Sequence, residues 1–377
     1  MSDVVLFDWL IPGIKSFLVI FMVLNLAAML LWIERKGSAL IQNRIGANRA
    51  GIAEGLFGRQ ILPVNLGFVN TLIADPMKLF TKEEFVPDGA DKFIHSIAPF
   101  LALFPAVVTM VAVPFGDSVE LFGRTVELQA VRLDVGVLYI SAMVSLGVYG
   151  VALAGWASNN RWALLGSIRG SAQMISYELA MGVSLVSMIL FYGTLDMQAM
   201  VRQQGGLFLG VLPNWGIFYQ PIAFLVIFVA GIAESKRVPF DLPECESELI
   251  SGYFTEYSGG KQASFMLSDF AEGVMVAGLV TTMFFGGWQV PYLSKAGLAL
   301  PGMAPLALPA LAITLMQVGA FMVKVLFFCW LQILIRWTIP RFRYDQLMRL
   351  GWKGMVPVAL VNLILTALLI LLMEKPA

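Results

Sequence analysis

The stretch that decides the fold, residues 135–157, reads VGVLYISAMVSLGVYGVALAGWA and contains no charged side chain. A helix needs about 20 apolar residues to cross a bilayer, so this stretch is long enough for a transmembrane helix. The composition agrees: 58% of the 377 residues are hydrophobic and 13% are charged, whereas soluble domains carry about 25% charged residues. The sequence therefore predicts an all-α, polytopic integral membrane protein.

Similar apolar runs occur along the rest of the chain. We expect eight transmembrane helices in a single integral-membrane domain over residues 1–377, at about 14–33, 93–114, 135–157, 172–192, 220–238, 266–288, 312–337 and 355–373. The fifth run is short and continues into an acidic segment. The apolar, proline-rich segment between the sixth and seventh spans is expected to lie at the membrane interface. No internal repeat is evident, which disfavours an inverted-repeat transporter.

The distribution of basic residues predicts the orientation. The loops after the first, third, fifth and seventh spans carry 18 of the 25 Lys and Arg residues, and the opposite side with both termini carries six. Because cytoplasmic loops are enriched in Lys and Arg, we expect both termini on the outer, periplasmic side. The N-terminal residues resemble neither a cleavable signal nor a transit segment. A bacterial inner membrane is therefore the expected location.

The first cytoplasmic loop contains an amphipathic pattern. Residues 64–80 read VNLGFVNTLIADPMKLF, with apolar residues recurring at helical spacing and polar residues, including Asp75 and Lys78, on the other side. This pattern predicts a helix at the membrane surface, bent at Pro76. The alternative is a helix that covers a partner or the core of the protein itself.

Acidic residues concentrate on the same predicted side. Residues 234–257, ESKRVPFDLPECESELISGYFTEY, hold six of the 25 carboxylates, and we expect an acidic cytoplasmic loop over about 235–265. The carboxylates in or beside the spans also fall in the cytoplasmic half: Glu34, Glu178, Glu234, Asp269 and Glu272. Ionisable groups inside a membrane are costly and usually functional. We therefore expect one buried acidic funnel, open to the cytoplasm, that could pass protons.

Structural roles for these acids are the alternative. Glu34 would pair with Arg35 or Lys36 at the head-group level, and Glu272 would be a first-turn acid favoured by the helix dipole. Asp241 to Glu244 fits a capping pattern, with Glu244 and Glu248 then on one helix face. Capping leaves the remaining acids unexplained, so we interpret the following set as proton-coupling residues: Glu178, Glu234, Asp241, Glu244, Glu246, Glu248 and Asp269.

Several classes of function are disfavoured. The two cysteines lie 84 residues apart, and His95 is the only histidine, so a bis-His haem within the chain is excluded and no metal spacing is visible. The chain carries no nucleotide-binding glycine motif, and its net charge is zero, so nothing points to nucleic acid. We expect no bound metal, haem or flavin. The outward halves of the spans carry no carboxylate, and Lys324 is alone near the centre of the seventh span, so a full proton crossing would need another subunit.

Five blocks of sequence then resemble one known family. They are IERKGSALIQNRIGANRAG (33–51), GVYGVALAGWASNNRWALLGSIRGSAQMISYELAMG (147–182), AESKRVPFDLPECESELISGYFTEYSG (233–259), FFGGW (284–288) and IRWTIPRFRYDQLMRLGWK (335–353). Together they resemble the membrane subunit that bears the quinone site in respiratory complex I, called the H subunit in bacteria and subunit 1 in mitochondria.

The resemblance implies an eight-helix subunit of the proton-translocating NADH-quinone oxidoreductase, which joins the peripheral redox arm to the proton-pumping membrane arm. Its substrate would be a quinone, ubiquinone or menaquinone, reduced by electrons from an iron–sulfur cluster in a partner. The implied partners are the peripheral-arm iron–sulfur and quinone-site subunits, the small and antiporter-like membrane subunits, and the lipid bilayer. The family itself binds no redox cofactor.

The resemblance also implies a quinone channel along the first span, the sixth span and the amphipathic helix. We assign eight residues to it: Glu34, Arg35, Lys36, Arg44, Asp75, Arg237, Tyr253 and Phe265. The glutamates that match the family's motifs are Glu178, Glu234, Glu244, Glu246 and Glu248. This chain differs from the family pattern at Ala47, in the longer segment from Gly58 to Gly67, and at Asp269, where the family often has glutamate.

Three rival interpretations stay open. A membrane coupling subunit of an energy-converting hydrogenase or formate hydrogenlyase keeps a related acidic loop without a quinone, but the complete loop block and the block before the last span favour complex I. A stand-alone cation/proton antiporter would need ionisable residues along the whole crossing. A purely structural anchor would not need to bury Glu178.

Overall fold

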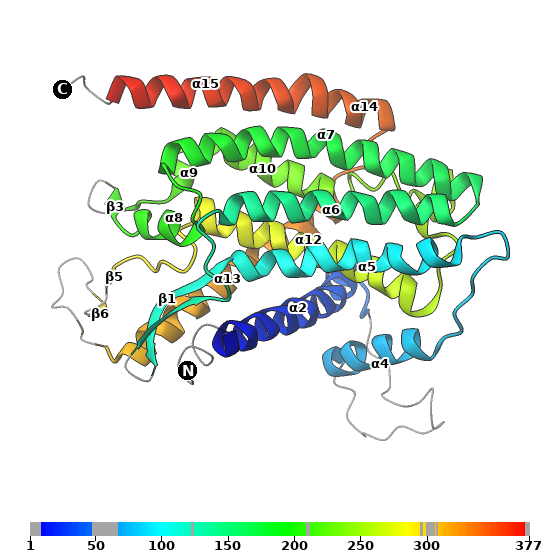
Figure 1. The fold of residues 1–377 in the computed structure, drawn as a ribbon, viewed down its shortest axis with the longest axis horizontal. Coiled ribbons are helices and arrows are strands. Elements are labelled where there is room, and N and C mark those ends of the chain that lie inside the picture. The colour runs from blue at the N-terminus through cyan, green and yellow to red at the C-terminus, as the bar shows by residue number, and fades with distance from the viewer. Residues whose placement is uncertain are drawn as a thin grey trace.

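The computed structural model is a bundle of long helices that run side by side (Figure 1). It describes residues 9–46, 67–121, 124–208, 212–294, 297–298, 306 and 308–373. Ala47 and residues 58–66 of the longer segment lie outside the described residues.

Seven helical segments are long and apolar enough to cross a membrane. They are α2 (Ile11–Ile41), α5 (Lys92–Val108) continued by η2 (Thr109–Ala112), α6 (Gly136–Ala157), α7 (Arg161–Tyr192), α12 (Gly259–Phe284), α13 (Ala310–Thr338), and the run of α14 (Tyr344–Arg349), η4 (Leu350–Met355) and α15 (Val356–Met373). The prediction of an all-α polytopic membrane protein is confirmed.

The fifth predicted span corresponds to α10 (Pro221–Glu234), which has 14 residues. At 1.5 Å per residue it is about 21 Å long, against about 30 Å for the hydrocarbon core. The helix also ends at Glu234 rather than at residue 238, because the backbone turns at Lys236, whose φ is +52°. The eighth transmembrane span therefore stays a prediction.

Three short antiparallel hairpins interrupt the helices in the described part of the chain. The longest joins β1 (Pro114–Leu121) to β2 (Arg124–Gln129), with Val119 opposite Val126. The others are β3 (Leu207–Phe208) with β4 (Leu212–Pro213), and β5 (Leu293–Ser294) with β6 (Gly297–Leu298). Sequence analysis missed the first hairpin, although β-branched residues stand on both sides of Phe122 and Gly123, with Val119 before them and Thr125 and Val126 after them.

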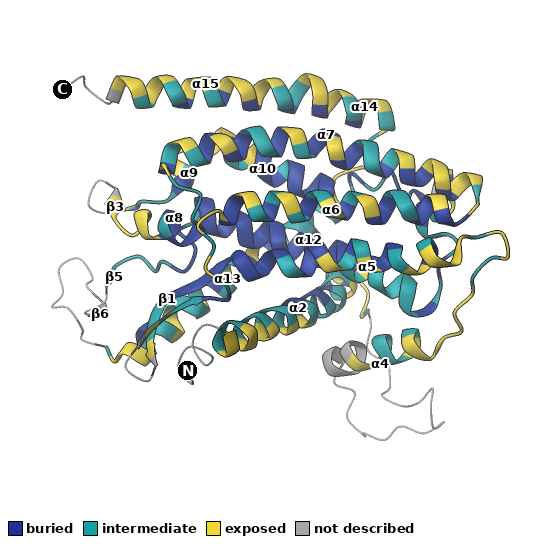
Figure 2. Cartoon of the chain, in the orientation of Figure 1, coloured by how far each residue is buried: buried dark blue, intermediate teal, exposed yellow. Residues whose placement is uncertain are grey.

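The core lies around α12, which packs against α2, α5, α10 and α13. Figure 2 shows α12 almost entirely buried, whereas α2 and α15 present exposed faces. Small residues allow the close packing that membrane helices depend on. At Gly150 of α6, for example, a Cβ atom would lie 2.5 Å from the backbone nitrogen of Ala102 in α5. Apolar side chains on the outer faces are what a lipid-facing surface requires.

A helix also forms within the predicted amphipathic segment. It is α4 (Gly67–Thr81), it contains Pro76, and it contacts both α2 and α12. Its position at a membrane surface stays a prediction. The remaining short helices are α8 (Met197–Gln203), α9 (Gly216–Tyr219), α11 (Glu246–Leu249) and η3 (Gly252–Phe254).

Candidate functional site

Six charged side chains from four segments meet near the C-terminal part of α2. This charge cluster consists of Glu34, Lys236, Arg237, Asp269, Glu272 and Arg336. The Glu34 carboxylate lies between two guanidinium groups, with the Nη1 atoms of Arg237 and Arg336 each 2.8 Å from one of its oxygens. Glu34 thus pairs across the bundle with α13 and with the segment after α10, and the expected pairing with Arg35 or Lys36 is wrong.

Lys236 forms the most buried part of the charge cluster. Its side chain is 1% exposed, and its Nζ atom lies 3.0 Å from Asp269 Oδ1 and 3.0 Å from Glu272 Oε2. The interpretation of Glu272 as a first-turn acid is wrong, because α12 begins at Gly259 and both carboxylates lie well inside it. A buried ammonium and two carboxylates stabilise one another only because they are paired.

Glu234, the last residue of α10, differs from these acids. It is 2% exposed, and neither carboxyl oxygen has a hydrogen-bond partner among the residues that the structure describes. The charged groups that act on it are Glu272, Glu178 and Lys236. Glu178, on α7, accepts a hydrogen bond from the Ser145 hydroxyl of α6. Two predicted proton-coupling acids therefore lie within the bundle, one of them without a partner in the described part of the chain.

The acidic loop folds differently from the predicted capped helix. The helix α11 begins at Glu246, so Glu244 precedes it and does not share a face with Glu248. The reason is tertiary: Asp241 accepts from Arg341 Nη2 at 2.7 Å, and Glu244 accepts from the Tyr253 hydroxyl at 3.1 Å. These acids are thus bonded to distant side chains rather than to a helix N-terminus.

The structure describes the side chain of only one of the two other predicted proton-coupling acids in the loop. Glu248 pairs with Arg169 of α7 at 2.7 Å. The Glu246 side chain lies outside the described residues.

Burial changes the acidity of this loop. It raises the pKa of Asp241 to about 6, although Arg341 and Arg336 act to lower it. It also raises the pKa of Glu244 well above its usual range, and the negative charges of Asp269 and Asp241 raise it further. Both carboxyls hold protons more tightly than exposed acids do.

Two cavities adjoin the charge cluster and share Phe270 as a wall. The larger, of about 220 Å³, lies between α2, α4, α5 and α12, and its walls are mostly apolar, with Asp75 and Ser264 as polar exceptions. The smaller, of about 20 Å³, is lined by Arg237, Asp269, Phe270 and Arg336 among others, and has the size of a single water molecule. The Arg237 guanidinium stacks on the Phe270 ring, 3.4 Å from its centroid. One aromatic side chain thus separates an apolar chamber from the charges.

The predicted channel residues are only partly brought together. Asp75 lines the larger cavity and pairs with Arg35 at 2.7 Å. Lys36 and Arg44 instead bond within the turn after α2, to the Ile45 carbonyl and the Gln42 side chain.

Tyr253 and Phe265 take a different place. They are buried in an aromatic group with Tyr257, at centroid distances of 5.3 and 5.0 Å from Phe265. Of the eight predicted residues, only Asp75 and Arg237 therefore line a cavity in the described part of the chain.

Sequence analysis missed several members of the site. Glu272 was placed in the acidic funnel but not among the proton-coupling residues, and Arg336 and Arg341 were assigned no role. The only available signal was the recurrence of arginines in the block before the last span, at residues 335–353. Within the described residues, no group of three or more His, Cys, Asp or Glu side chains is arranged to hold a metal ion.

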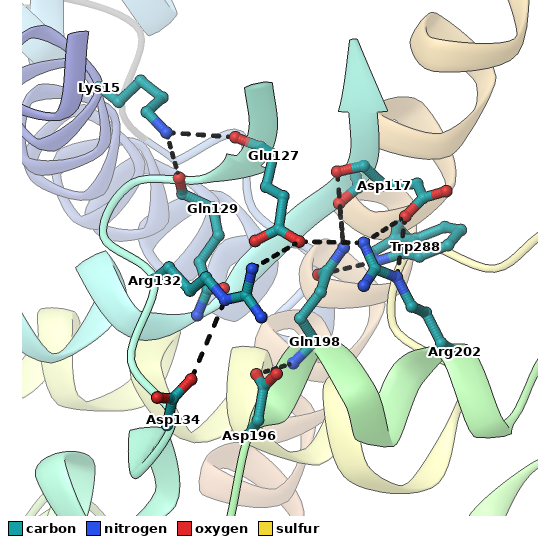
Figure 3. A network of polar contacts seen from close by, with 11 residues as sticks. Lys15, Asp117, Glu127, Gln129, Arg132, Asp134, Asp196, Gln198, Arg202 and Trp288 are labelled. Atoms are coloured by element: carbon teal, nitrogen blue, oxygen red, sulfur yellow. Dashed lines mark hydrogen bonds and ion pairs between the residues drawn. The ribbon is translucent and has the colours of Figure 1, made fainter. Parts of the chain in front are cut away.

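A second polar region lies where α2 and α13 begin (Figure 3). This hairpin network ties the β1–β2 hairpin to the helices. Arg202 of α8 lies 2.9 Å from Asp117 Oδ1 and 3.1 Å from Glu127 Oε1, and Arg132 lies 3.7 Å from Glu127. Lys15 of α2 donates to the carbonyl oxygens of Glu127 and Gln129. The side chains of Arg202 and Arg132 are 45% and 65% exposed, whereas Asp117 and Gln129 are buried.

Together these features define a polytopic helical membrane protein with a charge cluster buried between its helices. A family model described as NADH dehydrogenase matches residues 14–367. Two relatives are named as H subunits of NADH-quinone oxidoreductase. The chain is 42% identical to that of Bdellovibrio bacteriovorus, with 97% of each chain covered, and 44% identical to the H subunit numbered 2 of Geobacter sulfurreducens, with 95% of this chain and 96% of the relative covered. A third relative, NADH-quinone oxidoreductase subunit 8 of Rhodothermus marinus, is 42% identical, with 94% of this chain and 95% of the relative covered. The chain belongs to this family.

Proposed function

We propose that this chain forms the quinone channel and the proton-coupling element of complex I. Membership of the family makes it a membrane subunit of that complex, a proton-translocating NADH-quinone oxidoreductase. In this role it joins the peripheral redox arm to the proton-pumping membrane arm. The electrons come from an iron–sulfur cluster of a partner subunit, and the quinone is the substrate.

One observation carries the proposal: an apolar cavity and a buried charge cluster share the wall formed by Phe270. An apolar chamber between four helices suits a quinone with its hydrocarbon tail. The charges on the other side of Phe270 suit proton coupling. They are buried, and a change of one charge in such surroundings has a large energetic effect. The arrangement supports a channel beside groups that sense its charge.

The coupling follows from the balance of the reaction. A quinone that accepts two electrons also takes up two protons to become a quinol. Protons drawn from the acids of the loop leave negative charge beside Lys236 and Arg237, in a site that tolerates little net charge. Reprotonation then proceeds through Glu234, which is buried, and Glu178, which is half-buried. The antiporter-like membrane subunits complete the transfer of protons across the membrane, because the outward halves of this chain's predicted spans carry no carboxylate.

The proposed setting matches the sequence. The chain lies in a bacterial inner membrane with both termini on the periplasmic side. The acidic loop and α4 then face the cytoplasm, where the peripheral-arm subunits dock and supply electrons. The small membrane subunits pack against the exposed apolar faces.

Photolabelling of the intact complex with a quinone analogue tests the channel. We expect labels on this chain within α4 or the first half of α12. Ala263→Phe, which fills the larger cavity, should weaken labelling and raise the KM for quinone several-fold. Ala142→Phe, the same change on an exposed face of α6, is the matched control and should alter neither. A complex labelled elsewhere with this chain clean would make the hydrogenase-type coupling subunit the better interpretation.

The proton-coupling role has its own test. We expect Glu178→Gln to lower the number of protons pumped per quinone reduced, while quinone labelling persists. Glu120→Gln changes an exposed glutamate of the hairpin and serves as the control. Unchanged pumping in Glu178→Gln would exclude this residue from the relay.

A further inference from the structure

The charge cluster is balanced when all of its members are ionised. Three cations, Lys236, Arg237 and Arg336, face three carboxylates, Glu34, Asp269 and Glu272. Buried ions are tolerated only when their charges compensate. Lys236 is decisive for this balance, because it is the only cation within 4.0 Å of Asp269 and Glu272 in the described part of the chain.

Glu234 lies beside the charge cluster, but it is not one of the three carboxylates that the three cations balance. Both of its oxygens are buried, and no described residue forms a hydrogen bond with them. An ionised carboxylate without partners is very costly in such a place. The carboxyl of Glu234 is therefore kept neutral by a proton, provided that Lys236 neutralises the acids next to it.

Glu244 is the corresponding acid on the loop side. It accepts a hydrogen bond from the Tyr253 hydroxyl, and the charged groups that act on it are Asp269, Asp241 and Lys236. Asp269 and Asp241 are acids, so Lys236 is the cation among these three. The same ammonium of Lys236 thus acts on an acid of the loop and on an acid at the end of α10.

We propose that Lys236 is a positioning residue that decides which acids carry the coupled protons. It keeps Asp269 and Glu272 ionised and leaves Glu234 and Glu244 as the proton carriers. This inference rests on the proposed function and deepens it. The other charged or titratable groups facing Lys236 and its partners from the surrounding elements are Glu34 of α2, Glu178 of α7, Tyr253 of η3 and Arg336 of α13.

The consequence can be counted in protons. Lys236→Met keeps a side chain of similar length and removes one positive charge. The charge cluster must then bind one more proton to stay neutral, on Asp269 or Glu272. Lys236→Met combined with Glu272→Gln removes one charge of each sign, so this double variant needs no added proton. Lys236→Arg retains the charge.

Infrared difference spectroscopy of the intact complex, each variant against the unaltered protein in the same redox state, measures this directly through the carbonyl band of protonated carboxyls. We expect Lys236→Met to add one such group and to lower the protons pumped per quinone. The double variant should lack the added band, and Lys236→Arg should resemble the unaltered protein. Lys324→Met is the control: this lysine donates to the carbonyls of Phe285, Gly287 and Gln289, which are backbone groups, so no band should appear.

Each outcome of these measurements either supports or overturns the inference about Lys236. An assembled Lys236→Met complex with no added band and unchanged pumping overturns the inference. If Lys236→Met does not assemble, the double variant takes over the test, because the restored balance predicts assembly; a double variant that also fails overturns the inference. Quinone labelling of the unaltered complex reports separately on the proposed function. Retained labelling with an unchanged band contradicts only the role of Lys236.

Discussion

Two glutamates in this molecule each lie between two arginines, and the arginines differ in how far they are exposed to solvent. Glu34 is 2.8 Å from each of its partners, whereas the distances at Glu127 are 3.1 and 3.7 Å. The arginine Arg237 of the charge cluster is 15% exposed, but Arg132 of the hairpin network is 65% exposed. Water replaces a lost partner more readily in the hairpin network than in the charge cluster, where the adjoining cavity has the size of a single water molecule. One glutamate between two arginines is thus part of a candidate functional site in the charge cluster and a contact between structural elements in the hairpin network.

The largest effect is expected from a glycine beside the charge cluster. Gly252 has a φ of +58°, and a Cβ added to it would lie 1.7 Å from the Pro243 carbonyl oxygen. Gly252→Ala must therefore displace the acidic loop, at a cost on the order of 4–5 kcal/mol. Gly193, which ends α7 at a φ of +65°, has no described atom within 4 Å of such a Cβ, so Gly193→Ala should cost only about 1–2 kcal/mol.

Native gel electrophoresis of the heated complex compares the two glycine variants. The temperature at which this chain leaves the complex should fall far more for Gly252→Ala than for Gly193→Ala. Equal falls would mean that the loop rearranges freely around residue 252, and that its contact with Pro243 is unimportant.

The second prediction uses the two glutamates. Glu34→Gln leaves Arg237 and Arg336 without a compensating charge, and removing one partner of a buried pair costs about 3 kcal/mol or more. Glu127→Gln makes the same chemical change in the hairpin network, where exposed ion pairs contribute about 0–1 kcal/mol. The same heating experiment should therefore separate them. Similar losses would show that the charge cluster is open to water.

The third prediction concerns pH. Burial raises the pKa of Asp241 to about 6 in the folded loop, against about 3.9 in an unfolded chain. The folded loop thus binds this proton more tightly, so the carboxyl favours the closed loop fully below about pH 4, and this contribution is lost as the pH rises through about 6. The expected change is about 3 kcal/mol.

Hydrogen exchange of residues 241–257, corrected for the intrinsic pH dependence, measures this loss. Asp241→Asn should remove the dependence, whereas Asp345→Asn should keep it, because Asp345 is an exposed acid paired with Arg343. A loop that closes more tightly as the pH rises would mean that the ion pair with Arg341 outweighs burial.

The contrast between the two regions also explains what the sequence could predict. Hydropathy alone placed seven of the eight expected spans on helices of membrane-crossing length, because each span is a local property of about 20 residues. The acidic character of the loop was equally local. The pairing of those acids was not, because Lys236 and Glu272 meet only after α12 packs beside α10, and Glu34 finds Arg336 in a helix close to the other end of the chain.

Two errors show the same limit. The sequence around Asp241 fits a helix cap. In the structure Arg341 binds Asp241 and Tyr253 binds Glu244, and the helix begins further along the chain, at Glu246. The β1–β2 hairpin lies between two predicted spans, in a segment to which the sequence analysis assigned no structure. In the acidic loop, tertiary partners that the spacing of residues does not reveal decided the local structure.

The smallest effect is expected from Arg132→Gln. This guanidinium is 65% exposed and lies 3.7 Å from Glu127 and 3.9 Å from Asp134. Such pairs contribute about 0–1 kcal/mol, and salt at physiological strength screens them over roughly 8 Å. The temperature at which the chain leaves the complex should therefore hardly change, and any change should vanish in high salt. A large, salt-resistant loss would instead mean that another subunit covers the hairpin network in the assembled complex, and that its charges are as buried there as those around Lys236.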